Sequence, residues 1–175
     1  PGVNEREFIL SLYKRFGKQV HFIIPKPENS FPNEVPIENF SFFHSHKRHN
    51  FFLYPFYTIT QLKQLKRVIQ KNPVEYMVFR LDVLPVAIYS ITKKYHIPYS
   101  IKTMGPKVVT VLKERGSIIG KLLYDYNYRI TKKIIEGSDA IDSVSLIQVN
   151  ALKSMFSEYS EKFNWIDNAV NTLRF

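Results

Sequence analysis

Apolar residues along this chain recur at two spacings, one typical of helices and the other of strands. From Asn4 to Phe16 they return every three or four positions, which predicts an amphipathic helix capped by Asn4. Gly17 then stands where a left-handed residue commonly ends a helix. The apolar run Val20–Ile24 precedes Pro25 and predicts a short buried strand.

The segment from residue 25 to residue 57 breaks this pattern. Its first part holds four prolines, and its second part holds eight phenylalanine and tyrosine residues. Because aromatic residues are enriched in strands, we expect short strands near Ile37–Phe43 and Phe51–Tyr54.

Alternation of helix and strand resumes at Thr60, the expected N-cap of the next helix. The elements predicted after it are strand Val74–Phe79, a helix from Pro85 to Tyr95, strand Tyr99–Thr103, helix Ile118–Glu136, strand Ala140–Val144, a helix through Phe156 and strand Phe163–Ile166. Ser145 and Gln148 have the spacing of a capping box. This order predicts an α/β fold, a Rossmann-like and mainly parallel sheet with helices on both faces.

The predicted helix Ile118–Glu136 is the longest of the set. Its apolar residues share one side at helical spacing, and they are Ile119, Leu122, Tyr126 and Ile130. We expect this side to be the apolar face, and Gly137 to close the helix.

Composition narrows the class of protein. The 175 residues are 45% hydrophobic, which suits one domain with a substantial core. No stretch approaches the roughly 18–20 apolar residues of a membrane-spanning helix. The absence of cysteine excludes disulfides, thiolate metal ligands and a cysteine nucleophile, and cytosolic residence is the simplest interpretation. The net charge of +10 predicts an anionic partner, which is nucleic acid, phospholipid or a phosphorylated metabolite.

Four stretches carry a resemblance to a known family. In order they are PGVNEREFILSLYKRFGKQVHFIIP, VEYMVFRLDVLPVAIYSITKKYHIPYSIKTMG, GSDAIDSVS and IDNAVNTLRF. They are similar to a glycine-rich turn with the first helix and second strand, to a central strand–helix–strand, to a strand ending in Ser at a helix start, and to an inter-domain linker. Together they resemble the N-terminal domain of GT-B-fold glycosyltransferases of the group 1 (family 4) retaining type.

The resemblance implies one half of a GT-B fold. Residues 1–166 would form the Rossmann-like acceptor-side domain, and residues 167–175 would begin the linker to a C-terminal nucleotide-sugar domain that this chain lacks. The implied enzyme transfers a sugar from a nucleotide-sugar donor to a glycan or lipid-linked acceptor, without a metal or another cofactor. The isolated chain would then be inactive.

Two residues depart from the family pattern. Met104 stands in a turn where members often carry His, and Ala169 replaces the second Gly of the linker. Because Met cannot donate a hydrogen bond to a sugar or a phosphate, the resemblance assigns no catalytic residue here.

Candidate ligand contacts follow the strands, since open α/β sheets bind ligands at the carboxyl ends of their strands. These candidates are Gly2, Arg80, Asp82, Thr103, Met104, Gly105 and Ser145. Arg80 suits a two-point contact with phosphate or carboxylate, or else a surface pair with Asp82. Ser145 is explained as a helix cap with ligand contact as a second role. Gly2 lets the backbone approach a phosphate, or is an ordinary turn glycine.

A basic, aromatic segment offers a different kind of contact. Three histidines, His44, His46 and His49, surround Lys47 and Arg48. Two adjacent cations oppose a metal ion, so a solvated basic loop is the better interpretation. Together with Phe51 and Phe52, Lys47 and Arg48 suit the surface of an anionic membrane, unless the aromatic rings belong to the core.

Two other functions stay open at the level of sequence. A basic Rossmann-like module could bind nucleic acid, because aromatic side chains beside Lys and Arg stack on bases. Against this, the basic residues are dispersed along the chain, and no RNA-recognition, helix-turn-helix or zinc-finger signature is present. Met104 also fits a non-catalytic glycosyltransferase homologue.

Overall fold

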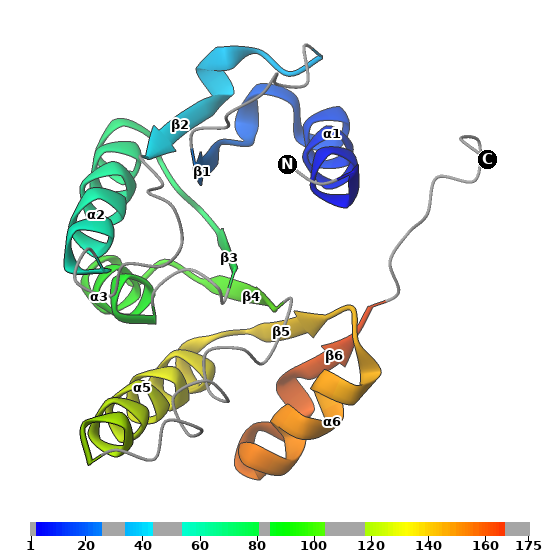
Figure 1. Cartoon of the computed structure of the whole chain (residues 1–175). Helices are drawn as coiled ribbons and strands as arrows, with labels where there is room; N and C mark the ends of the chain where they lie inside the picture. The colour runs from blue at the N-terminus through cyan, green and yellow to red at the C-terminus, as the bar shows by residue number, and fades with distance from the viewer. Residues whose placement is uncertain (1–2, 26–33, 44–53, 81–84, 104–117, 167–175) are drawn as a thin grey trace. The chain divides into compact units, whose positions relative to one another are not determined.

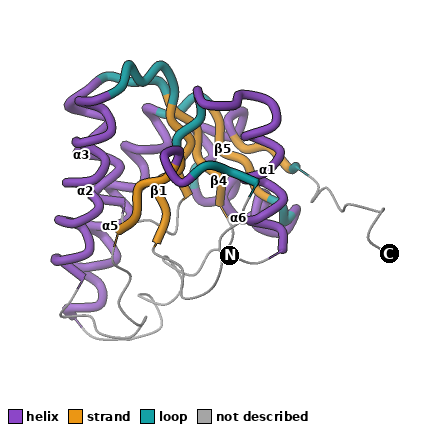
Figure 2. The backbone as a smooth tube through the Cα atoms, turned by 90° about the horizontal axis from the view of Figure 1, so that it is seen from above, coloured by secondary structure: helices purple, strands orange, loops and turns teal. Residues whose placement is uncertain are grey.

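The computed structural model describes residues 3–25, 34–43, 54–80, 85–103 and 118–166. The described residues divide into two compact units, a first unit up to Pro73 and a second unit from Val74 onward. The first unit holds two strands between two α-helices, and helix and strand alternate along the second unit (Figures 1 and 2).

The first unit is built around one pair of parallel strands. Its elements are α1 (Val3–Phe16), the 3-10 turn η1 (Gly17–Gln19), β1 (Phe22–Pro25), the 3-10 turn η2 (Ile37–Asn39), β2 (Phe40–Phe43) and α2 (Tyr54–Lys71). Phe22 of β1 lies opposite Phe40 of β2, and the two rings stack with their centroids 5.2 Å apart. Ile9 of α1 and Val35 complete the buried cluster. Gly17 ends α1 with a φ of 55°, the left-handed conformation predicted for it.

Helix starts in the first unit differ from the predictions. α1 begins at Val3, so Asn4 lies inside the helix and is not its cap. α2 begins at Tyr54, six residues before Thr60, so Thr60 is also internal and Tyr54 is helical rather than extended. Pro55 explains the early start, because proline has a suitable φ and needs no donor in the first turn of a helix. The rest of the predicted strand, residues 51–53, lies outside the described residues.

The second unit carries a four-stranded sheet. Its elements are β3 (Met77–Arg80), α3 (Pro85–Tyr95), β4 (Tyr99–Thr103), α5 (Ile118–Gly137), β5 (Ala140–Ser143), α6 (Leu146–Met155), the 3-10 segment η4 (Ser157–Lys162) and β6 (Phe163–Trp165). The strand order is β3-β4-β5-β6, and all neighbours are parallel. Each helix therefore crosses to the next strand in the same direction. Right-handed crossovers then place α3, α5 and α6 on one side of these strands, as Figure 1 shows.

The sheet face under these helices forms the core of the second unit. Tyr99, Ile101 and Thr103 alternate along β4 and are all buried, as the sequence predicts. Ile88 and Ile91 of α3 and Ile134 of α5 are also fully buried. The chain is thus an α/β protein with parallel strands flanked by helices, which confirms the predicted α/β class and the mainly parallel sheet. Among the described helices, none is both long and apolar enough to cross a membrane.

Two of the four residues expected on the buried, apolar face of α5 are exposed, so the prediction is wrong at these positions. Leu122 is 66% exposed and Tyr126 is 53% exposed, whereas Ile134 and Ile135 nearer the C-terminus are buried. The cause is a mismatch of lengths. A helix of 20 residues is about 30 Å long, while the five residues of β4 span about 17 Å, so the first half of α5 extends beyond the sheet.

Candidate functional site

The carboxyl ends of β4 and β5 bring two hydroxyl groups together. Thr103, the last residue of β4, lies opposite Ser143, the last residue of β5, in the register of the sheet. Both side chains are buried, Thr103 at 0% exposure and Ser143 at 1%. Ligands of open α/β sheets bind at this end of the strands, so the edge is the candidate site of the second unit.

Gln148 from α6 connects the two hydroxyl groups. Its side-chain amide donates a hydrogen bond to Thr103 Oγ1, and its Oε1 accepts one from Ser143 Oγ at 2.7 Å. Gln148 is itself only 4% exposed, and its neighbours on α6, Val149 and Leu152, are buried as well. The three side chains satisfy one another in a dry environment, which fixes the position of α6 against both strands.

Ser145 is the N-cap of α6, as the sequence predicts. Its Oγ accepts from the backbone N–H of Gln148 at 3.4 Å. The other half of the predicted capping box is wrong, because the Gln148 side chain does not return to the N–H of Ser145. That N–H donates instead to Ser143 Oγ at 3.2 Å. The amide of Gln148 serves two buried hydroxyls that would otherwise be costly to leave unpaired.

The first turn of α6 supplies what a ligand can contact. Helix geometry leaves the N–H groups of Leu146 and Ile147 without acceptors in the helix, at the positive end of its dipole. Their side chains are 49% and 83% exposed. The edge therefore combines backbone donors with exposed apolar groups. The hydroxyls of Thr103 and Ser143 lie below the surface and hold this turn in place.

The network itself contains only neutral side chains, so it can bind and position a ligand but supplies no acid or base. Tyr99, the first residue of β4, is ionisable. Its hydroxyl donates a hydrogen bond to the backbone oxygen of Ile134 at 2.6 Å. Burial raises the pKa of this phenol, so Tyr99 stays a neutral donor. Within the described residues, no three His, Asp or Glu side chains gather as metal ligands would.

The structure brings three of the predicted site residues to one edge. Arg80 is the last residue of β3 and lies opposite Lys102 in the register, close to the end of β4, although its side chain is not among those described. Thr103 and Ser145 belong to the network. Several predicted residues lie outside the described residues and stay predictions: Gly2, Lys47, Arg48, Phe51, Phe52, Asp82, Met104 and Gly105, with the three histidines of the basic segment.

Sequence reasoning missed Ser143 and Gln148. Ser143 is two positions after the buried Ile141, so the alternation of β5 already placed its side chain on the covered face. Gln148 was assigned to a capping box alone, although the adjacent Val149 and Leu152 indicate the buried side of α6.

Comparison with known proteins adds no relative. The chain matches no protein-family model, and none of the curated proteins matches it. Its function must therefore be argued from its own residues and fold.

Proposed function

We propose that this chain is the acceptor-binding N-terminal domain of a retaining glycosyltransferase, which transfers a sugar from a nucleotide-sugar donor to a glycan or lipid-linked acceptor. The observation that carries the proposal is the edge formed by Thr103, Ser143, Ser145 and Gln148 at the carboxyl ends of parallel strands. The resemblance of four stretches, in the same order as in the family, supports it.

The chemistry of the edge suits a sugar. A pyranose presents hydroxyl groups together with apolar C–H faces. The N–H groups of Leu146 and Ile147 can donate to the sugar hydroxyls, and the exposed side chains of the same residues can pack against the apolar C–H faces. The buried network under this turn would keep the acceptor in a fixed orientation toward the donor, which is a main source of rate enhancement in group transfer.

Arg80 adds a charged contact to the proposal. At the end of β3 its guanidinium would hold a phosphate or carboxylate of a lipid-linked acceptor. The donor would bind mainly to a C-terminal domain outside this chain, so the isolated chain would bind without catalysing transfer. The resemblance implies no metal or cofactor beyond the nucleotide sugar.

The charge of the chain fits an acceptor at a membrane surface. A net charge of +10 favours anionic lipid, and Lys47, Arg48, Phe51 and Phe52 would supply the contact. The proposed location is the cytoplasm, with the protein free or peripheral to the membrane.

The proposal can be tested by binding the full chain to an array that carries oligosaccharides, lipid-linked sugars and single-stranded oligonucleotides. Ile147→Asp places a carboxylate at the edge, where an acidic group in the first turn also favours the helix. Asn150→Asp adds the same charge to an exposed position of the same helix and is the matched control.

We expect saccharide binding by the wild type and by Asn150→Asp, and its loss in Ile147→Asp. Equal saccharide binding by both variants would exclude this edge as the site. Binding to oligonucleotides without saccharides would instead support the nucleic-acid module.

A further inference from the structure

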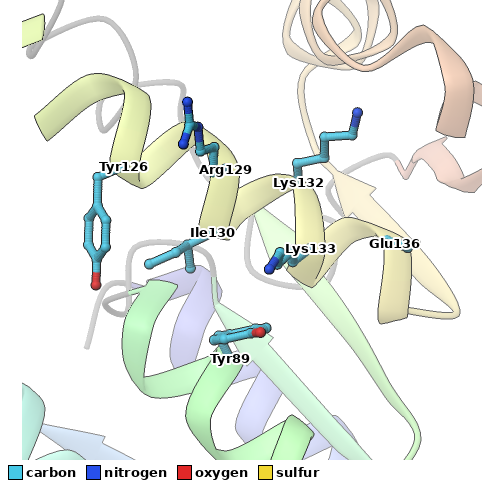
Figure 3. Close-up of a pocket in the computed structure, with 7 residues that line it drawn as sticks. All are labelled: Tyr89, Tyr126, Arg129, Ile130, Lys132, Lys133 and Glu136. Atoms are coloured by element: carbon cyan, nitrogen blue, oxygen red, sulfur yellow. The ribbon is translucent and has the colours of Figure 1, made fainter. Parts of the chain in front are cut away.

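A groove runs between α3 and α5 on the second unit, and it has a volume of about 400 Å³. Figure 3 shows Ile130 and Lys133 of α5 pointing toward α3, where Tyr89 lies beneath them. Tyr126 borders the same groove one helical turn before Ile130. A volume of this size is within the range of small-molecule sites, roughly 300–1,000 Å³.

Two ammonium groups contact the ring of Tyr89, which lines this groove together with Lys133. Lys133 Nζ of α5 lies 5.7 Å from the centroid of the Tyr89 ring, and Lys93 Nζ of α3 lies at the same distance. The ring attracts both cations, but it carries no net charge that would neutralise either of them.

Ion pairs do not neutralise these two lysines. Lys132 forms an ion pair with Glu158 at 2.6 Å and points away from α3 (Figure 3). By contrast, Lys93, Arg129 and Lys133 make no ion pair with the residues that the structure describes. Glu136 is the one acidic residue among those that line the groove. An anion bound in the groove would be attracted by Lys133, which lines it, and by Lys93 beside the same ring.

The other end of the groove is apolar and aromatic. Tyr126 is 53% exposed, and Ile130 is partly buried beside it. Lys133 lies seven positions after Tyr126, which corresponds to about 10 Å along the helix axis. A planar ring could thus rest on Tyr126 and Ile130 while an anionic group, joined to that ring by a spacer such as a ribose, reaches the two lysines.

We propose that this groove binds a nucleoside phosphate, with the base stacked on Tyr126 and the phosphate held by Lys93 and Lys133. Base stacking on tyrosine and phosphate contacts from lysine are the interactions that proteins use for single nucleotides and for single strands. The limited volume of the groove favours one nucleotide over a longer strand.

This groove is separate from the edge proposed for the acceptor. The hydroxyl of Tyr99, at the start of β4, bonds to Ile134 O, directly after Lys133 on α5. Thr103 lies four residues further along the strand, about 13 Å away. The lysine end of the groove is therefore near the amino ends of the strands, and the candidate acceptor edge is at their carboxyl ends. The inference does not depend on the proposed function.

The test is calorimetric titration of the full chain with uridine diphosphate and adenosine diphosphate, compared with uridine and with inorganic pyrophosphate. We expect both nucleotides to bind, and each fragment to bind at least tenfold more weakly. Lys133→Gln should weaken nucleotide binding about tenfold, the usual consequence of losing one charge-assisted contact. Tyr126→Leu should weaken it to a similar extent by removing the stacking surface.

Lys153→Gln is the control, because it removes one exposed positive charge from α6 in the same unit. Lys93→Gln repeats the lysine test from the other helix should Lys133→Gln fail to fold. Pyrophosphate binding as tightly as the nucleotides, or equal losses in Lys133→Gln and Lys153→Gln, would show a general attraction of anions and overturn the proposal. Binding to phosphatidylserine vesicles with no binding of nucleotides would overturn it in favour of a lipid surface.

Discussion

Gln148 is the residue whose replacement most directly tests the buried network. Gln148→Met keeps the length of the side chain but removes the donor to Thr103 Oγ1 and the acceptor of Ser143 Oγ. A buried polar group left unpaired costs about 1–3 kcal/mol. Ser143 Oγ still accepts the hydrogen bond from the N–H of Ser145 at 3.2 Å, so the cost at Ser143 falls at the low end of this range. Thr103 is fully buried, so its unpaired hydroxyl costs more. We expect the free energy of unfolding to fall by about 2–3 kcal/mol.

A second substitution reverses the sign of the effect. In the wild type, Thr103→Val should be destabilising, because it leaves the amide of Gln148 unpaired. In the Gln148→Met background the same change removes a hydroxyl that has already lost its partner, so it should restore about 1 kcal/mol. Val and Thr have nearly the same shape, which keeps packing constant.

Urea denaturation provides the assay. The chain has a single tryptophan, Trp165, which lies in β6 opposite Ser143, so its fluorescence reports on the second unit. Two results would refute the reasoning. One is a Gln148→Met variant within about 0.5 kcal/mol of the wild type, the range of ordinary surface substitutions. The other is an equal loss from Thr103→Val in both backgrounds.

Three further predictions concern other contacts of the fold. Lys162→Met should destabilise the second unit by about 1–2 kcal/mol, because Lys162 Nζ donates hydrogen bonds to three carbonyl oxygens at the end of α5 at 2.6–3.2 Å. A urea midpoint equal to that of the wild type, followed by Trp165 fluorescence, would contradict this. Gly137→Ala places a Cβ 2.9 Å from the hydroxyl of Tyr99 and should lower the free energy of unfolding by about 1–3 kcal/mol. The same unfolding assay should show a smaller loss when the substitution is made in a Tyr99→Phe background. Burial lowers the pKa of His21, so the unfolded chain binds a proton at His21 more readily than the folded chain, and stability should fall as the pH drops below about 6.5. Thermal unfolding measured from pH 8 to pH 5 should show a weaker pH dependence in His21→Gln. An unchanged dependence would exclude His21 as the cause.

The second unit was the more predictable of the two from sequence. Pro85 at a helix start, Gly137 at a helix end and the alternation in Tyr99–Thr103 all have local physical causes, and the structure confirms each. The first unit was harder, because several local signals compete there. Thr60 is a good cap by residue type, yet Pro55 and the packing of α2 against β2 start that helix earlier.

The exposed half of α5 was beyond local reasoning. Leu122 and Tyr126 have the spacing of a buried helix face, yet both are exposed, because burial depends on how far the neighbouring strands extend. The site shows the same limit. Ser145 was found from its place before a helix, whereas the bond between Gln148 and Thr103 joins residues 45 positions apart and depends on the register of the sheet.

The binding of a sugar at the ends of β4 and β5 is the central claim, and one measurement tests it most directly. It is a titration of the isotopically labelled full chain with the saccharides of the array, followed by amide chemical shifts. We predict changes centred on the amides of Arg80, Leu146 and Ile147, with little change in the helices away from this edge. Changes centred elsewhere in the chain, or none with any saccharide or lipid-linked sugar, would contradict it.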